Sequence, residues 1–163
     1  MSHLNILQNK IYSLNALKTQ VTSWKKSGEK VVFTNGCFDV IHRGHIEVLA
    51  RTADLGDKLI IGLNADSSIK NLKGGGRPII DEKSRAVLLA ALSFVDAVVL
   101  FSEETPLNLI STLLPDVLAK GGDYEIATVV GCEIVQENGG KVILVPFVDG
   151  FSSTTIIDKI KNS

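Results

Sequence analysis

The sequence predicts an α/β protein built on an open, doubly wound parallel sheet, and three observations support that prediction. Short apolar runs alternate with stretches of helical periodicity along most of the chain, which is typical of β-α units. The run 58–63 is apolar on both faces, as expected of a parallel strand that helices cover on both sides. The polar and glycine-bearing clusters directly follow apolar runs, which places them at the carboxyl edge of the sheet, where such folds bind ligands.

Five apolar runs are the predicted strands. They span residues 31–34, 58–63, 97–101, 117–119 and 141–145. A helix is expected after each strand, so the prediction is a Rossmann-like, doubly wound, five-stranded parallel sheet with helices on both faces.

Capping residues and apolar periodicity set the expected helices. Ser13 is a candidate N-cap for a helix whose apolar stripe contains Leu17 and Val21, and Asp81 is a candidate N-cap for the next one. Thr105 and Pro106 are an expected N-cap and first helical residue. The expected helices cover 14–26, 44–55, 82–92, 106–114, a segment ending near 138, and 154–160. Residues 1–12 are expected to be a weak helix or an arm, and 64–81 a long functional or mobile loop.

Composition and charge narrow the class of protein. The chain has 163 residues, 45% hydrophobic and 21% charged, which predicts one folded domain over 1–163. The net charge of −1 offers no general attraction for nucleic acid or a membrane surface, so we expect neither as a partner. With no signal-peptide pattern and no apolar run long enough to span a bilayer, we expect a cytoplasmic protein. Cys37 and Cys132 are far apart and predict neither a metal site nor a disulfide.

The segment 34–45 follows the first predicted strand and is the strongest candidate for a functional site. It carries two of the three histidines, His42 and His45, at the start of a predicted helix. A helix start has unpaired N–H groups and a positive dipole end, which favour an anion. Gly36 and Gly44 would let a phosphate approach the backbone. In the alternative interpretations one histidine packs or caps the loop, or both bind a metal together with Cys37 and Asp39, although that spacing matches no standard zinc site.

Three further clusters follow other strands. Residues 152–155, Ser-Ser-Thr-Thr, open the last predicted helix, either as an ordinary N-cap or as a second phosphate contact. Residues 120–123, Lys-Gly-Gly-Asp, are either a tight turn or a nucleotide contact. Lys73 and Arg77 lie beside a run of three glycines and are either a mobile cationic clamp or solvated loop charges.

Two common phosphate-binding motifs are absent from the sequence. There is no GxxxxGK[ST], which excludes a P-loop NTPase, and no GxGxxG after the first strand, which disfavours a dinucleotide-binding dehydrogenase. The glycines at 74–76 open no predicted helix and do not alter this conclusion.

Residues 36–45, Gly-Cys-Phe-Asp-Val-Ile-His-Arg-Gly-His, resemble the GxFDxxHxGH signature of the cytidylyltransferase-like nucleotidyltransferases. Over roughly residues 11–162 the chain also resembles the adenylyltransferase domain of the ADP-heptose synthesis enzymes. The motifs that support this second resemblance are Leu72-Lys73-Gly74 with Arg77-Pro78, Val95-Asp96, Leu114-Pro115-Asp116, Lys120-Gly121-Gly122-Asp123-Tyr124 and Asp149-Gly150-Phe151-Ser152.

The resemblance implies a reaction. AMP would pass from ATP to D-glycero-β-D-manno-heptose 1-phosphate, giving ADP-heptose and pyrophosphate, with Mg²⁺ accompanying ATP. Many relatives fuse this domain to a sugar kinase, and because no kinase-sized segment is present here, a stand-alone transferase is expected. The product feeds lipopolysaccharide or other surface glycan synthesis, which implies a bacterial cytoplasm, and a homodimer is expected for the family.

The resemblance also implies roles for individual residues. His42 and His45 would be catalytic, contacting the triphosphate and stabilising the transition state. The nucleotide would be bound by Thr34, Asn35, Gly36, Cys37, Phe38, Gly44, Lys120, Gly122, Asp123, Ser152, Ser153 and Thr154. The sugar-phosphate side would involve Asp39, Lys73 and Arg77, and no protein side chain is predicted to bind a metal.

The sequence departs from related families at the last motif. Cytidylyltransferases of the glycerol-phosphate type usually carry an Arg-Thr pair before the hydroxyl cluster, whereas residues 148–151 contain no arginine. This favours the adenylyl reading over a glycerol-3-phosphate cytidylyltransferase, which stays the first alternative. Thr155 stands where the heptose relatives often have asparagine. A non-catalytic nucleotide-binding module is the second alternative.

Overall fold

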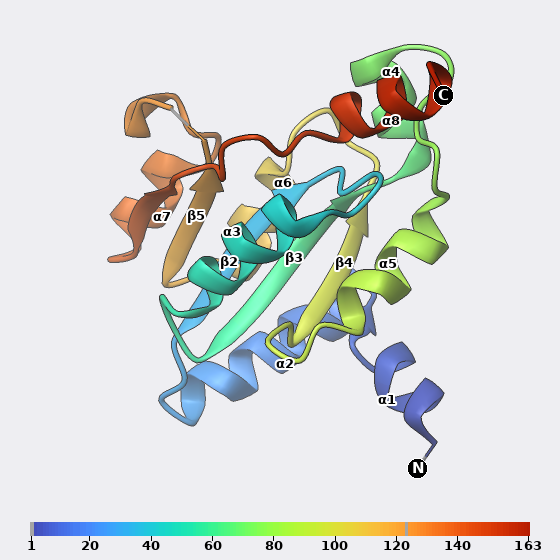
Figure 1. Cartoon of the computed structure of the whole chain (residues 1–163). Helices are drawn as coiled ribbons and strands as arrows, with labels where there is room; N and C mark the ends of the chain where they lie inside the picture. The colour runs from blue at the N-terminus through green and yellow to red at the C-terminus, as the bar shows by residue number, and fades with distance from the viewer. Residues whose placement is uncertain (1, 123) are drawn as a thin grey trace.

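The computed structural model describes residues 2–122 and 124–163, and it confirms the predicted parallel α/β architecture (Figure 1). Six strands form one sheet in the order β1-β4-β3-β2-β5-β6, and all five neighbouring pairs are parallel. The strands are β1 Ile11–Tyr12, β2 Val31–Gly36, β3 Lys58–Asn64, β4 Ala97–Phe101, β5 Val117–Gly121 and β6 Lys141–Val145.

The predicted count of five strands is wrong because β1 was expected to belong to an arm. This strand is only two residues long and pairs with β4 through Ile11↔Val98 and Tyr12↔Val99. A two-residue strand is too short to show an alternating pattern, so only its partner in the folded sheet reveals it.

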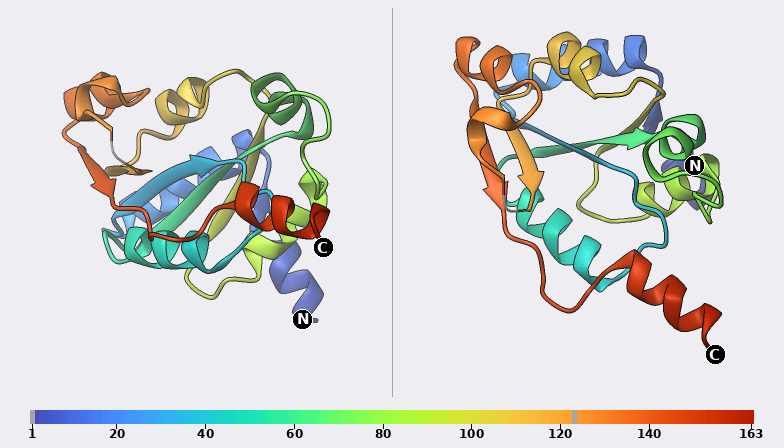
Figure 2. Two further views of the ribbon diagram at one scale, coloured as in Figure 1. Left: turned by 45° about the horizontal axis from the view of Figure 1, so that its top comes forward. Right: turned by 90° about the horizontal axis from the view of Figure 1, so that it is seen from above.

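Helices cover both faces of the sheet (Figure 2). On one face α2, α6 and α7 bury apolar residues against the strands, and on the other α3 and α5 do so. The helices are α1 His3–Gln8, α2 Leu14–Lys26, α3 Arg43–Ala53, α4 Asp66–Lys73, α5 Glu82–Ala90, α6 Leu107–Leu113, α7 Cys132–Glu137 and α8 Ser153–Lys161, with a 3₁₀ turn at Ile126–Thr128. Within the described ranges, no helix combines the length and the apolar character needed to cross a membrane.

The predicted caps of two helices are confirmed. The Ser13 hydroxyl accepts the N–H of Ala16 at the start of α2, and the Asp81 carboxylate accepts the N–H groups of Lys83 and Ser84 at the start of α5. The predicted stripe of α2 is buried in the core at Leu17 and Val21.

Several predicted boundaries are wrong. Residues 64–81 are not one long loop, because α4 occupies Asp66–Lys73 and buries Ile69. Pro106 lies at the N-cap of α6 rather than inside it. The helix expected to reach 138 is a 3₁₀ turn followed by α7, because Gly131, at φ +85°, interrupts it. The last helix begins at Ser153 instead of 154.

One repeated interaction fastens the amino edge of the sheet. An aspartate stands directly before each of β3, β4 and β5, and each exchanges two hydrogen bonds with the start of the neighbouring strand. Asp96 accepts the N–H of Leu59 at 2.9 Å and donates its own N–H to the Leu59 carbonyl at 3.0 Å. Asp116 does the same with Val31, and Asp57 with Lys30. These carboxylates extend the ladder by one residue and fix how the strands are aligned.

The strand order reverses between β2 and β5. From β2 the chain builds outward through β3 and β4, and it then returns to place β5 on the other side of β2. In doubly wound sheets the ligand crevice lies at this point, beyond the carboxyl ends of the strands.

Candidate nucleotide site

A cavity of about 660 Å³ lies at this crevice, within the range of small-molecule sites. Its walls come from the end of β2 and the loop after it, the first turns of α3, the end of α4, the end of β5, and the segment between β6 and α8. Segments far apart in the sequence therefore meet at one place, as the sequence predicted for its strand-end clusters.

Most of the predicted site residues line this cavity. They are Thr34, Asn35, Gly36, Cys37, Phe38, Asp39, His42, Gly44, His45, Lys73, Lys120, Ser152, Ser153 and Thr154. Gly122 lies just behind Phe147 of the cavity wall, and Arg77 is bonded to Asp39. Asp123 lies outside the described residues.

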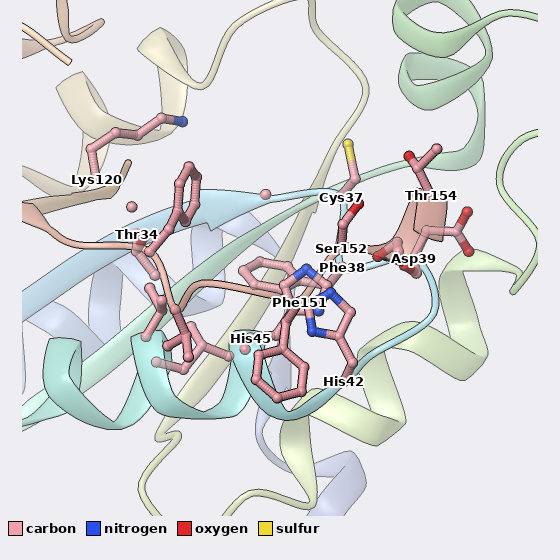
Figure 3. A pocket seen from close by; sticks show the side chains of 18 of the residues that line it. Thr34, Cys37, Phe38, Asp39, His42, His45, Lys120, Phe151, Ser152 and Thr154 are labelled. Carbon is pink, nitrogen blue, oxygen red and sulfur yellow. Dashed lines mark hydrogen bonds between the residues drawn. The ribbon is translucent and has the colours of Figure 1, made fainter. Parts of the chain in front are cut away.

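His42 and His45 stack on each other at the start of α3 (Figure 3). His42 is the N-cap residue, and the two ring centroids are 3.9 Å apart with an interplanar angle of 26°. The edge of Phe38 meets His45 at 5.5 Å between centroids, and Phe151 stacks beside His42. The two imidazoles therefore form one packed unit with aromatic neighbours.

Both histidines present a buried nitrogen without a partner. The Nδ1 atoms of His42 and His45 are buried and make no hydrogen bond within the described part of the chain. Burial, together with the nearby charges of His42 and Lys73, lowers the pKa of His45 to about 4, and burial lowers the pKa of His42. The pair is therefore neutral near pH 7, and its orphaned nitrogens suit the oxygens of a bound phosphate.

Gly44 allows the last segment to pack closely on α3. A Cβ at this position would lie 2.8 Å from the Phe151 Cβ and 3.1 Å from the His42 ring. Gly44 therefore leaves room for the neighbours of the histidine pair, in addition to the backbone access that the sequence suggested.

The hydroxyl cluster at the start of α8 divides into different roles. The Ser153 hydroxyl donates to the Asp39 carbonyl at 2.7 Å, which ties α8 to the loop after β2. Ser152 is the N-cap residue but makes no side-chain capping bond, and it lines the cavity together with Thr154. Ser152 and Thr154 therefore remain the hydroxyls placed to meet a ligand at this helix N-terminus.

Lys120 stands on the side of the cavity opposite the histidines (Figure 3). Its ammonium lies 3.5 Å from the Asn35 side-chain oxygen and 5.8 Å from the centre of the Tyr124 ring. Burial lowers the pKa of Lys120, and neighbouring Cys37 opposes that shift. Because this cation makes no salt bridge with a described carboxylate, it can meet an anionic ligand.

The Asp39 carboxylate is committed to the protein itself. It is fully buried and accepts the Arg77 Nε–H at 2.6 Å and the N–H groups of Ile79 and Ile80. Burial alone would raise the pKa of Asp39, but the two backbone N–H groups and Arg77 together lower it. Arg77 keeps one buried nitrogen, Nη2, without a partner in the described ranges.

Sequence reasoning missed several residues of the cavity wall. Phe147 and Tyr124 line it, and both rings lie close to Gly122, which has φ +120°. Phe147 is 63% exposed, so its ring is available at the cavity wall. For Phe147, the only signal in the sequence was its position two residues after the predicted strand 141–145.

The fold and the paired histidines define a nucleotidyltransferase, and the chain belongs to the cytidylyltransferase-like family, which it matches over residues 33–159. It is 52% identical over 155 residues to the "Bifunctional protein HldE" of Citrifermentans bemidjiense and 54% identical over 152 residues to that of Geotalea uraniireducens. These alignments cover 95% and 93% of this chain but 32% and 31% of the relatives, so the chain spans about a third of their length.

A solved structure shows the same fold. The lipopolysaccharide core biosynthesis protein from Thermoplasma volcanium is 31% identical, with a TM-score of 0.60, over 74% of this chain and 98% of that one. Among the described residues, no group of three or more histidine, cysteine, aspartate or glutamate side chains is arranged to hold a metal ion.

Proposed function

We propose that the protein transfers AMP from ATP to D-glycero-β-D-manno-heptose 1-phosphate, forming ADP-heptose and pyrophosphate. One observation above all supports this: a stacked pair of neutral histidines, with orphaned Nδ1 atoms at a helix N-terminus, faces Lys120 across the cavity. Such a site can bind the phosphates of a nucleotide at the histidines and the remainder of the nucleotide near Lys120. The choice of sugar and of adenine rests on the similarity of the chain to the ADP-heptose synthesis enzymes.

The chemistry needs no protein nucleophile. A phosphate oxygen of the sugar 1-phosphate forms a bond to the α-phosphorus of ATP, the bond from that phosphorus to the oxygen bridging the β-phosphate breaks, and pyrophosphate leaves. The attacking oxygen is already ionised, so no proton has to be removed. The protein aligns the two phosphates and stabilises the charge that develops at the α-phosphoryl group.

We assign the residues to parts of the substrates. His42 and His45 donate hydrogen bonds to the α- and β-phosphates in the transition state. Lys120 and the segment after β5 hold the ribose and base, and Ser152 and Thr154 hold the terminal phosphates at the start of α8. The free Nη2 of Arg77, together with Lys73, serves the sugar phosphate. Mg²⁺ would accompany ATP and would help to neutralise the charge of the triphosphate.

The experiment is a pyrophosphate-release assay with purified protein, Mg²⁺ and matched pairs of substrates. ATP with the heptose 1-phosphate is expected to release pyrophosphate and yield a product with the mass of ADP-heptose. The double variant His42→Ala/His45→Ala is the blank, because it keeps the cavity but lacks both imidazoles. No release with this pair, together with release from CTP and glycerol 3-phosphate, would overturn the proposal in favour of a cytidylyltransferase.

A second function of another class is a nucleotide-binding module without catalysis. It requires tight ATP binding with no pyrophosphate release for any phosphorylated acceptor. The presence of two stacked histidines argues against it, because binding a nucleotide without catalysis hardly needs both imidazoles.

A further inference from the structure

Arg85 is a fully buried charge that joins four segments next to the cavity without entering it. It lies on α5 and is 0% exposed. Its guanidinium donates to the carbonyls of Ile80 at 2.9 Å, Cys37 at 2.7 Å and Asn64 at 2.8 Å, and to the Asp66 carboxylate at 2.7 Å. Among the described residues, only the Asp66 carboxylate forms a salt bridge with it, and its other hydrogen bonds go to backbone carbonyls.

The segments that Arg85 joins are the ones that shape the site. Cys37 belongs to the loop between β2 and the histidines, Asn64 ends β3, and Asp66 begins the helix that carries Lys73. Ile80 is held twice, since its carbonyl accepts from Arg85 while its N–H donates to Asp39. A planar guanidinium with donors in fixed directions can fasten these groups at once, which a lysine cannot do.

The bond to Cys37 acts on a strained part of the loop. The next residue, Phe38, has φ +47°, and Val40 has φ +57°, conformations that are costly for side chains of this kind. The surrounding structure has to hold them there. The Cys37 carbonyl is the acceptor immediately before Phe38, so Arg85 fixes the peptide group on which the Phe38 backbone turns.

Phe38 connects this strained turn to a catalytic residue. Its ring is buried in the core on the α3 side of the sheet and meets His45 edge-on, 5.5 Å between centroids. His45 is held from its other side by the stacked His42. A displaced Phe38 would therefore let the His45 ring rotate away from its present position.

We propose that Arg85 is a positioning residue for the nucleotidyl transfer: by fastening the Cys37 carbonyl it sets Phe38, and through Phe38 it sets the ring of His45. The inference rests on the proposed function for its kinetic consequence, although its structural part does not need a substrate.

The test compares Arg85→Lys, Phe38→Leu and the double variant. Each single change is expected to lower kcat by about tenfold, as loss of catalytic alignment does, while the KM for ATP changes by less than about threefold. Because both act on the same ring, the double variant should lose little more than the worse single variant. The control is Asp96→Asn, which weakens a backbone cross-link at the opposite edge and should lower Tm with kcat unchanged.

A substrate-free readout separates this inference from the proposed function. The ring protons of His45, followed by NMR during a pH titration, should show its pKa moving up toward the ordinary value in Arg85→Lys and in Phe38→Leu, but not in Asp96→Asn. If Arg85→Lys does not fold, Phe38→Leu alone must show both effects. Full kcat with an unchanged His45 titration, or additive losses in the double variant, would overturn the proposal. If the wild type shows no turnover at all, the proposed function is rejected. The His45 titration alone then tests the positioning role of Arg85.

Discussion

At the amino edge of the sheet, Asp57, Asp96 and Asp116 each accept a backbone N–H from the neighbouring strand, whereas at the carboxyl edge the Nδ1 atoms of His42 and His45 are buried with no partner in the described ranges. The same sheet therefore has one edge whose aspartates are hydrogen-bonded to the backbone and another where the histidine Nδ1 atoms are left open. Buried polar atoms are usually paired, so the open edge is the one available for a ligand.

The comparison indicates which edge of the sheet contributes to stability and which to activity. Substitutions at the amino edge should change the free energy of unfolding and leave catalysis alone. Substitutions in the open edge should do the reverse, because its groups contribute their hydrogen bonds only when substrate is present. Arg85 is one exception, a satisfied group that serves the open edge, and Asp39 and Ser153 are two others.

The largest expected effect is on catalysis at the open edge. His42→Ala and His45→Ala should each lower kcat by about 10²-fold or more, the scale of losing one preorganised transition-state contact. Steady-state pyrophosphate release measures this, and thermal unfolding should give a Tm no lower than that of the wild type. Variants that keep near-full kcat would show that the imidazoles do not stabilise the transition state.

A smaller effect is expected from crowding the histidine pair without removing it. In Gly44→Ala the new methyl group would lie 2.8 Å from the Phe151 Cβ and 3.1 Å from the His42 ring, so one of them must shift. We expect kcat to fall by about tenfold, because misplaced catalytic groups lose alignment, with little change in unfolding because alanine favours a helix. Gly75→Ala is the matched control, since no atom lies within 4 Å of its Cβ position. Equal kcat for both variants would contradict a packing role for Gly44.

Features that depend on a local pattern of residues could be predicted from the sequence. Alternating strands and helices, the caps at Ser13 and Asp81, and the gathering of strand-end clusters followed from local residue types, and the structure confirms them. Contacts between segments that are distant in the sequence could not be predicted from it. The commitment of Asp39 to the N–H groups of Ile79 and Ile80 depends on the loop returning across the site.

Contacts between distant segments also explain why some strand and site residues were missed. β1 exists only because β4 offers an edge for Ile11 to pair with. Phe147 carries no motif in the sequence, and only the fold places its ring against Gly122. Arg85 lies in a predicted helix, and only the meeting of several segments around it in the fold shows its burial.

At the amino edge the expected effect is on stability alone. Asp116→Ala removes the acceptor of the Val31 N–H, and an unsatisfied backbone group costs about 1–3 kcal/mol. Urea unfolding should show this loss, while kcat stays at the wild-type value. Asp54→Ala is the control, because this exposed aspartate ends α3 and its loss should change stability by less than about 0.5 kcal/mol. A fall in kcat for Asp116→Ala would show that the two edges are coupled.

The last expected effect is a pH dependence of stability that arises at the open edge. Burial lowers the pKa of His45 to about 4 in the folded protein, whereas an unfolded histidine titrates near about 6.5. Between these values the unfolded chain binds the extra proton, so the stabilisation present above about pH 6.5 is lost as the pH falls toward about 4.

The variant His45→Gln removes this titration and keeps a polar side chain of similar length. Urea unfolding at about pH 7 and about pH 5 should therefore show a smaller loss of stability on acidification in His45→Gln than in the wild type. His42, whose pKa burial also lowers, is present in both proteins. An equal loss in the two proteins would mean that the His45 ring is solvated in the free enzyme, and the unpaired nitrogen that distinguishes the open edge would then be satisfied by water rather than reserved for substrate.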